Sequence, residues 1–395
     1  MNADFFKNNR NKLTEIAKGL PVVITANTEM QRVGDAAFPF AQEANFWYLT
    51  GIESANWRLI IVNGKTALVM PETSEISQIF NGSMSADEAQ TISGADQIIT
   101  HAESAEYLQK LAKKCDKVYT ILPENASDYE FSLNPTQAIL TTELSKKFKE
   151  VKDIRSELHK LRSIKRPDEI MMLRRAINLT CLAFRTVKED LVNYTFEYEA
   201  QARFTYEFER AGAMHAYDPI VASGLNANVL HYNLNRAGLK QGDLVLMDVG
   251  ARYGCYSADI TRTFAYGDIN ERQKQIHSAV CQAQAEIIKL VKPGFAIKEY
   301  LEKSDKIMKH ALQNLSLYKE EVDFRKYFPH AVSHGLGIET HDPLGRPKIF
   351  QPGMVLTVEP GIYIPEENIG VRIEDDILIT NTGNENLSRG LSVDF

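Results

Sequence analysis

Four apolar, strand-like segments in the second half of the chain each contain one acidic residue. Asp248 lies in LVLMDVG and Asp259 in YSADITRTF, while Glu359 ends MVLTVE and Glu374 interrupts IGVRIEDDILI. An ionised carboxylate inside a core is costly unless it is paired or bound to a cation. The recurrence of this feature predicts a cluster of divalent cations, because hard cations take oxygen ligands and two of them can share carboxylates.

Two of these acids are predicted to face each other across a hairpin. If Tyr253 and Gly254 form its two-residue turn, Asp248 pairs directly with Asp259. Paired side chains have Cβ atoms about 4.5–5.5 Å apart, where like charges repel. A cation between the carboxylates would remove the repulsion; the alternative is a chance placement on a solvated face of the sheet.

Strand alternation guides the choice among the three consecutive acids of IGVRIEDDILI. Glu374 and Asp375 would point to opposite faces. We favour Glu374 as a ligand because it shares a face with Arg372, which could orient it. Asp376 shares the same face and stays an alternative.

Histidines gather in the same part of the sequence. His330, His334 and His341 lie in FPHAVSHGLGIETHD, and His231 lies in NVLHYN. A donor set of carboxylates and imidazoles without thiolates favours Mn²⁺, with Co²⁺, Zn²⁺ or Fe²⁺ as alternatives. A closed structural zinc site would normally be rich in cysteine.

The charge balance argues against nucleic acid or membrane partners. The chain has 45 Lys and Arg against 52 Asp and Glu, a net charge of −7, which offers no basic surface for phosphates. The N-terminal MNADFFKNNRNKL lacks the apolar core of a signal peptide, and no stretch approaches the roughly 18 apolar residues that span a bilayer. We therefore expect a cytoplasmic location.

The length of 395 residues predicts two domains. The first contains the apolar runs PVVITA, RLIIV and TALVM, together with residues 46–49, which we expect to form a core strand of an α/β unit. Asn63-Gly64 predicts a tight hairpin turn, and Pro167 predicts the start of a long helix. The expected domains are an α/β unit over 1–152 and an α+β unit over 153–395.

Several segments resemble one family. MDVGARYGCYSADITRTF, SHGLGIETHD, PGMVLTVEPGIYI and IGVRIEDDILIT are similar to the pita-bread metallopeptidases, which include methionine aminopeptidase, prolidase and Xaa-Pro aminopeptidase. VGDAAFPFAQEANFWYLTGI resembles the N-terminal domain of the proline-specific branch. The resemblance implies a C-terminal pita-bread fold, a curved antiparallel sheet covered by helices. It also implies a smaller N-terminal domain for substrate access and oligomer contacts, and a homodimer or tetramer.

The resemblance also implies a ligand set. The residues that match the family's metal ligands are Asp248, Asp259, His334, Glu359 and Glu374. Asp259 and Glu374 would each bridge two divalent ions. In this family such ions activate a shared water as hydroxide and polarise the scissile carbonyl.

Other residues match the family's catalytic and substrate-binding positions. Glu359 would also shuttle a proton, His341 would stabilise the oxyanion, and His231 would bond near the carbonyl or the leaving nitrogen. His330 would line the proline pocket and Arg372 would orient the bridging carboxylates.

The function implied is hydrolysis of the Xaa-Pro bond at the N-terminus of a peptide that has proline in second position. FPFAQEANFWYLTG looks more like the aminopeptidase branch than like prolidase, the Xaa-Pro dipeptidase, which is the first alternative. The short connection between Glu359 and Glu374 departs from several aminopeptidases of the family and leaves the preferred peptide length open. A non-catalytic binding module of this fold is the remote alternative, which the complete ligand set disfavours.

Overall fold

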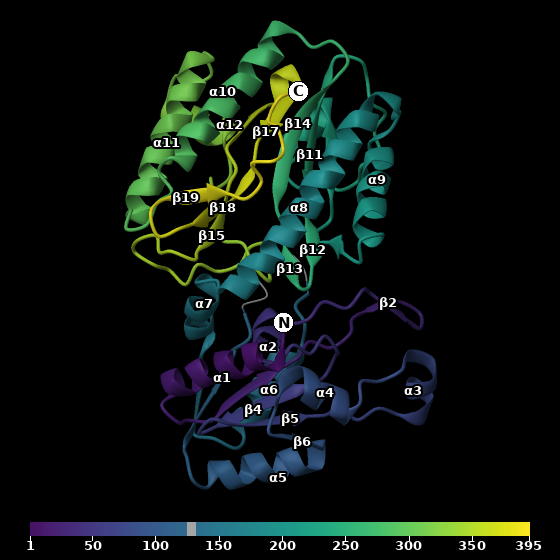
Figure 1. Cartoon of the computed structure of the whole chain (residues 1–395), viewed down its shortest axis with the longest axis vertical. Helices are drawn as coiled ribbons and strands as arrows, with labels where there is room; N and C mark the ends of the chain where they lie inside the picture. Colours follow the sequence, from purple (N-terminus) through teal and green to yellow (C-terminus); the bar gives the residue numbers. More distant parts are fainter. Residues whose placement is uncertain (125–131) are drawn as a thin grey trace. The chain divides into compact units, whose positions relative to one another are not determined.

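The computed structural model describes residues 1–124 and 132–395. The chain divides into two compact units, Met1–Leu161 and Arg162–Phe395 (Figure 1). The division falls within α7 (Arg155–Ser163), whereas the sequence predicted a boundary after residue 152. Among the described residues, no helix combines the length and apolar composition that crossing a membrane requires.

The first unit is built on a six-stranded mixed sheet in the order β6-β5-β4-β1-β7-β8. Its strands are β1 (Val22–Thr25), β4 (Arg58–Val62), β5 (Lys65–Val69), β6 (Gln97–Ile99), β7 (Lys117–Thr120) and β8 (Glu150–Asp153). Its other elements are α1 (Ala3–Ala17), α3 (Glu75–Asn81), α4 (Ala86–Ser93), α5 (His101–Ala112), α6 (Thr136–Ser145), β2 (Gln31–Val33) and β3 (Ala36–Ala37). Val23, Ile60, Leu108 and Leu140 belong to its core. The α/β character predicted for this unit is confirmed.

The predicted hairpin turn between β4 and β5 is confirmed. Val62 pairs with Lys65, so Asn63 and Gly64 form a two-residue turn. Both have positive φ, 49° and 76°, which matches the twist that joins adjacent antiparallel strands.

The predicted core strand over residues 46–49 is wrong, because these residues belong to the helix α2 (Ala44–Thr50). The Glu43 carboxylate accepts a hydrogen bond from the Phe46 amide (2.6 Å) and so caps the first turn. Gly51 ends the helix at a φ of 72°, where a Cβ would lie 2.4 Å from the Phe6 ring. All seven helical residues are buried, so the apolar run reflects complete burial rather than a strand.

The second unit places short antiparallel sheets between two groups of helices. In Figure 1, β11 (Asp243–Val249), β14 (Ile260–Tyr266) and β17 (Ile369–Arg372) lie between the pair α8–α9 and the pair α10–α11. These helices are α8 (Pro167–Asp190), α9 (Glu197–Glu209), α10 (Glu271–Ile288) and α11 (Ile297–Asn314), followed by α12 (Glu321–Tyr327). The remaining strands are β9 (Met214–His215), β10 (Ile220–Ser223), β12 (Ala251–Tyr253), β13 (Tyr256–Ser257), β15 (Val355–Val358), β16 (Gly361–Ile364), β18 (Asp375–Ile379) and β19 (Asn384–Asn386). Ile276, Met308, Leu356 and Val371 belong to the main core. The predicted α+β class is confirmed.

Three of the four acid-bearing segments are divided in two at the acid. Asp259 lies between β13 and β14, Glu359 between β15 and β16, and Glu374 between β17 and β18. At the last two breaks the chain changes partners, because β16 pairs with β17 while β15 pairs with β18. These acids therefore lie where a strand leaves one sheet for another.

The predicted register of the hairpin that contains Asp248 and Asp259 is wrong, because its two-residue turn lies one residue later than predicted. Tyr253 pairs with Tyr256, so Gly254 and Cys255 form the turn, and both have positive φ. Asp248 consequently pairs with Thr261 rather than with Asp259. The regular ladder is interrupted at Gly250, where a Cβ would lie 1.8 Å from the Ala258 carbonyl oxygen.

Candidate metal centre

The second unit contains a cavity of about 630 Å³ into which the acid-bearing breaks open. Every residue that the sequence predicted for the site lines this cavity: Asp248, Asp259, His334, Glu359 and Glu374, and also His231, His330, His341 and Arg372. Tyr217, Asp218, Leu230 and Asn233 lie in the same wall. The structure therefore brings together residues that span more than 140 positions of the chain.

Carboxylates and one imidazole converge at the base of the cavity. Ligand atoms of Asp259, His334 and Glu374 all lie within 4.8 Å of one another. The His334 Nε2 atom is 3.3 Å from Asp259 Oδ2 and 3.4 Å from Glu359 Oε1. Asp248 joins the group through Tyr217, whose hydroxyl lies 2.6 Å from Oδ1 of Asp248 and of Asp259. The two aspartates thus converge despite the shifted hairpin register.

The orientation of His334 suits a metal ligand. Its Nδ1 atom lies 3.0 Å from the Gly335 carbonyl oxygen, so Nδ1–H can donate there while Nε2 faces the carboxylates. Burial opposes a charged ring, yet the hydrogen bond to Asp259 and the charge of Glu359 raise the pKa of His334 to about 9. The surrounding negative charge therefore attracts a cation to the Nε2 position.

The carboxylates are buried beyond what nearby cations balance. Asp259 is 4% and Glu374 1% exposed. Burial raises the pKa of Glu359 to about 7, and burial together with Asp259 raises the pKa of Glu374 well above its ordinary value. The raised pKa values reflect burial and the repulsion between neighbouring carboxylates. The donor set therefore fits divalent cations, which would supply the missing positive charge.

Arg372 contacts the cluster from β17. Its Nη2 donates to Asp248 Oδ2 (2.5 Å) and its Nε donates to the Thr261 hydroxyl (3.1 Å). That hydroxyl in turn donates to Glu374 Oε2 (2.6 Å). Arg372 thus contacts Asp248 directly and Glu374 through Thr261.

His330 belongs to a separate hydrogen-bond chain in the cavity wall. Arg372 Nη1 donates to the Tyr363 hydroxyl (2.8 Å), which lies 2.9 Å from His330 Nε2. The His330 Nδ1 atom lies 2.8 Å from the Ala331 carbonyl oxygen. Burial and then the charge of Arg372 lower the pKa of His330 to about 4, so this ring is neutral at pH 7.

His341 lies close to His334, at the other end of one loop. Their ring centroids are 4.2 Å apart, and residues 335–340 connect them. Asp342 fixes the end of this loop, because its buried carboxylate pairs with Arg162 and with Lys165 Nζ (2.9 Å). His231 lies in a different loop, between β10 and β11, and is exposed.

Asp376, the alternative to Glu374, is fully buried but has a different contact. Its Oδ2 accepts a hydrogen bond from the backbone amide of Asp259 (3.2 Å). It is not part of the group formed by Asp259, His334 and Glu374 in the described chain. Asp376 thus supports the backbone of one acid, and the choice of Glu374 as ligand stays a prediction.

Sequence reasoning missed the hydroxyl groups that connect the site. Tyr217 and Thr261 contact the acids directly, and Tyr363 joins His330 to Arg372. Tyr363 carried a signal, since it lies in the apolar strand GIYI and a buried tyrosine hydroxyl needs a partner. Tyr217 carried none, because it precedes Asp218-Pro219 in a segment without alternation.

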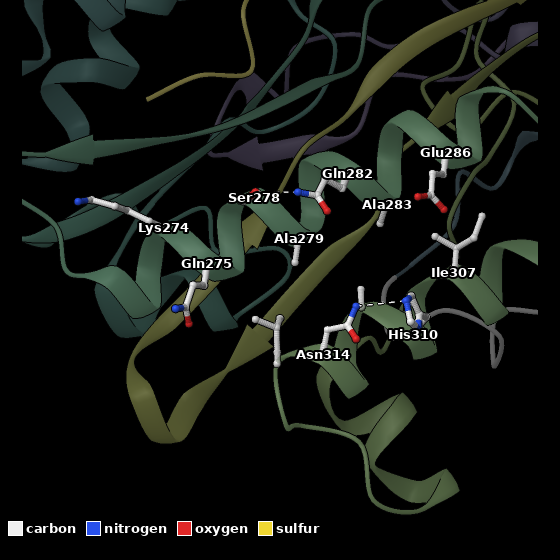
Figure 2. A pocket seen from close by; sticks show the side chains of 12 residues that line it. Lys274, Gln275, Ser278, Ala279, Gln282, Ala283, Glu286, Ile307, His310 and Asn314 are labelled. Atoms are coloured by element: carbon white, nitrogen blue, oxygen red, sulfur yellow. Dashed lines mark hydrogen bonds between the residues drawn. The ribbon is translucent and has the colours of Figure 1, made fainter.

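A second hollow, of about 370 Å³, lies between α10 and α11 (Figure 2). Its polar side chains pair along their own helices. Gln282 Nε2 donates to the Ser278 hydroxyl (3.1 Å), and Asn314 Nδ2 lies 3.2 Å from His310 Nε2. No group of metal-ligating side chains was found at this hollow in the described part of the chain.

Comparison with known proteins agrees with this geometry. Residues 171–381 match metallopeptidase family M24, and residues 6–119 match the N-terminal domain of aminopeptidase P. An Xaa-Pro aminopeptidase from Escherichia coli (strain K12) is 34% identical over 97% of this chain and 94% of the relative. An Xaa-Pro dipeptidase from Pyrococcus horikoshii is 30% identical over 88% of this chain and 91% of the relative.

Solved structures give the same result. The low-pH form of aminopeptidase P from E. coli has a TM-score of 0.89 and 32% identity, and the match covers 99% of this chain and 96% of that chain. The agreement extends over both units, and the M24 match alone covers more than half of the chain. The chain therefore belongs to metallopeptidase family M24, in its aminopeptidase P branch.

Proposed function

We propose that the cavity of the second unit is where this metal-dependent Xaa-Pro exopeptidase hydrolyses its peptide substrates, with a pair of divalent ions as cofactor. The observation that carries the proposal is the convergence of Asp259, His334 and Glu374 within 4.8 Å, in a cavity that two further acids, the buried Asp248 and the partly buried Glu359, also line. The proposed ligands are Asp248, Asp259, His334, Glu359 and Glu374. Mn²⁺ is the proposed metal, because the donors are carboxylates and one imidazole.

When bound, such ions activate water as a nucleophile and polarise the scissile carbonyl. Glu359 is the proposed proton carrier, and the Thr357 hydroxyl, which donates to its Oε1 (3.1 Å), orients it. His341 is the proposed donor to the oxyanion, and His231 the proposed donor near the carbonyl or the leaving nitrogen.

The remaining residues would bind and orient. His330, held neutral and fixed through Tyr363, would line the pocket for the proline ring. Arg372 would hold the carboxylates in place, directly at Asp248 and through Thr261 at Glu374. Neither residue would exchange a proton with the substrate.

Metal dependence is tested by chelation and elemental analysis. The purified chain should contain about two divalent ions, and their removal should abolish peptidase activity, because the protein supplies no nucleophilic side chain. Adding back Mn²⁺, Co²⁺ or Zn²⁺ in parallel compares the candidate metals. Full activity in metal-free protein would contradict the proposal.

We propose that the preferred substrates are longer than dipeptides, in keeping with an aminopeptidase rather than a dipeptidase; the E. coli relative is named an Xaa-Pro aminopeptidase. Assaying Ala-Pro-Ala, Ala-Ala-Ala and Ala-Pro side by side tests this. Ala-Pro-Ala should be cleaved with by far the highest kcat/KM, because the imide nitrogen and its fixed ring are recognised together. Rapid cleavage of Ala-Pro alone would instead indicate a dipeptidase.

We also propose a homo-oligomer, a dimer or a tetramer, in the cytoplasm. Support for association comes from α3, where Ile76, Ile79 and Phe80 are 69%, 81% and 80% exposed. Apolar side chains three and four positions apart form one face of a helix. Light scattering of the wild type and of Phe80→Ser measures the state directly.

A further inference from the structure

One buried carboxylate contacts both ends of the loop that carries His231. Glu197, the first residue of α9, is 0% exposed. Its Oε1 accepts hydrogen bonds from the Ser223 amide (2.8 Å) and the Ser223 hydroxyl (2.8 Å), where the loop begins. Its Oε2 accepts a hydrogen bond from the Ala237 amide (2.8 Å), where the loop ends.

The same carboxylate also contacts the interior of the loop. The Asn226 side chain donates to Oε1 (3.1 Å), and the Tyr232 hydroxyl donates to Oε2 (2.9 Å). Tyr232 directly follows His231 in the chain. All five donors are uncharged, and the position of Glu197 in the first helical turn further stabilises its negative charge. Four points of the loop are therefore fixed by a single side chain.

Hydrophobic packing contributes little to this fixation, because Leu230 and Tyr232 are only partly buried against a small core cluster. Leu225, Val229 and Leu234 all direct their side chains to solvent and are 58%, 56% and 61% exposed. Ala227 is buried, but it has only a methyl group to bury. A loop with so little buried apolar surface is held by its polar contacts, and loops held in this way readily open locally.

We propose that Glu197 is a positioning residue that sets the place of His231 in the cavity. This inference rests on the catalytic role proposed above for His231. Glu197 does not line the cavity, so it acts through the loop. A shift of about 1 Å in a group that contacts the transition state can lower the rate about 10²-fold.

The test uses the full-length metal-loaded enzyme and compares Glu197→Gln with Glu199→Gln. Glu199 is a matched control on the same helix, because its carboxylate accepts only from the Thr195 and Phe196 amides in the described contacts. Glu197→Gln should lower kcat on Ala-Pro-Ala about tenfold or more at unchanged metal content. Glu199→Gln should leave kcat within about twofold. Equal effects of the two variants would overturn the inference.

A double-mutant cycle with His231→Ala identifies the route of the effect. If Glu197 acts through His231, Glu197→Gln lowers kcat little further in the His231→Ala background. A full additional loss there would overturn the inference while leaving the role of His231 intact. A wild-type rate for His231→Ala would instead refute the proposed role of His231, and the inference with it.

A milder variant covers the case in which Glu197→Gln does not fold. Tyr232→Phe removes one donor and leaves the carboxylate and the aromatic ring in place. It should lower kcat by a smaller factor, about two- to fivefold, with the same dependence on His231. Ser223→Ala removes another donor to Glu197 and serves as a second mild variant. The inference would be overturned if folded Tyr232→Phe had an unchanged kcat and if Ser223→Ala lowered kcat by the same factor with and without His231→Ala.

Discussion

The loops that carry His231 and His341 are both fixed by a buried carboxylate, but the partners of the two carboxylates differ. Glu197 accepts hydrogen bonds from five uncharged donors. Asp342 pairs instead with two buried cations, Arg162 and Lys165, and it also accepts a hydrogen bond from the Glu339 amide (3.3 Å). The His231 loop is therefore held by hydrogen bonds to a carboxylate, and the His341 loop by buried ion pairs.

The difference determines what is lost when either carboxylate is removed. Without Glu197, neutral donors lose an acceptor, which costs about 1–3 kcal/mol for a buried group. Without Asp342, the buried Lys165 loses this partner and Arg162 keeps the ion pair with the exposed Glu339 side chain. Breaking a buried ion pair costs about 3–5 kcal/mol. We therefore expect the Glu197 anchor to matter mainly for catalysis and the Asp342 anchor mainly for stability.

The largest effect should separate the two histidines of the charged loop. His334→Ala should lose metal and with it nearly all activity, because its Nε2 faces three carboxylate-bearing residues of the cluster. His341→Ala, like His231→Ala in the other loop, should lower kcat about 10²-fold with its metal retained. Metal content and kcat measured on the same preparations check this. An empty site in His341→Ala beside a full one in His334→Ala would mean that the two roles are exchanged.

The next effect concerns stability and compares the two anchors directly. Asp342→Asn should destabilise the protein by about 3–5 kcal/mol, against about 1–3 kcal/mol for Glu197→Gln. Urea denaturation, monitored by far-UV circular dichroism, gives the unfolding midpoints of both variants. The comparison sharpens if Asp342→Asn combined with Lys165→Met recovers part of the loss. Equal midpoints for the two single variants would contradict the expected difference between the two carboxylates.

The smallest effect is the acid dependence of the charged anchor. Burial opposes ionisation of Asp342, but Arg162 and Lys165 lower its pKa from 3.8 to about 2. The ionised carboxylate therefore stabilises the fold above about pH 4, and this contribution is lost as the pH falls toward 2. The stability difference between the wild type and Asp342→Asn should shrink by about 1 kcal/mol from pH 5 to pH 3. A difference that stays constant over this range would show that Asp342 does not titrate as part of the pair.

The sequence predicted the site better than the local structure around it. An acid within an apolar segment is visible without any fold, because the cost of burying charge applies wherever the segment packs. Asp248, Asp259, Glu359 and Glu374 were found in this way, and all four line the cavity. Which of them bind metal remains a prediction.

What the sequence did not reveal depends on partners that are distant or on small differences in backbone geometry. A hairpin with its turn at Gly254-Cys255 differs by one residue from one at Tyr253-Gly254, and both pairs contain a glycine. Residues 46–49 are buried on all sides, so their periodicity does not distinguish helix from strand. Glu197 and Asp342 are ordinary acids in sequence, and only the tertiary structure brings their partners to them.

The contacts of Glu197 also mean that the two ends of the loop over residues 224–236 are held together by a side chain outside the loop. Both of its ends meet one side chain, so the entropy of bringing them together is already offset at the anchor. Closure entropy grows slowly with length, by about 0.6 kcal/mol for each doubling. The other interior residues can therefore be exchanged, or the loop extended, provided that His231, the Glu197 partners Asn226 and Tyr232, and the buried Asn235 are kept. This offers a route to enzymes that accept different peptides without rebuilding the carboxylate cluster beneath the loop.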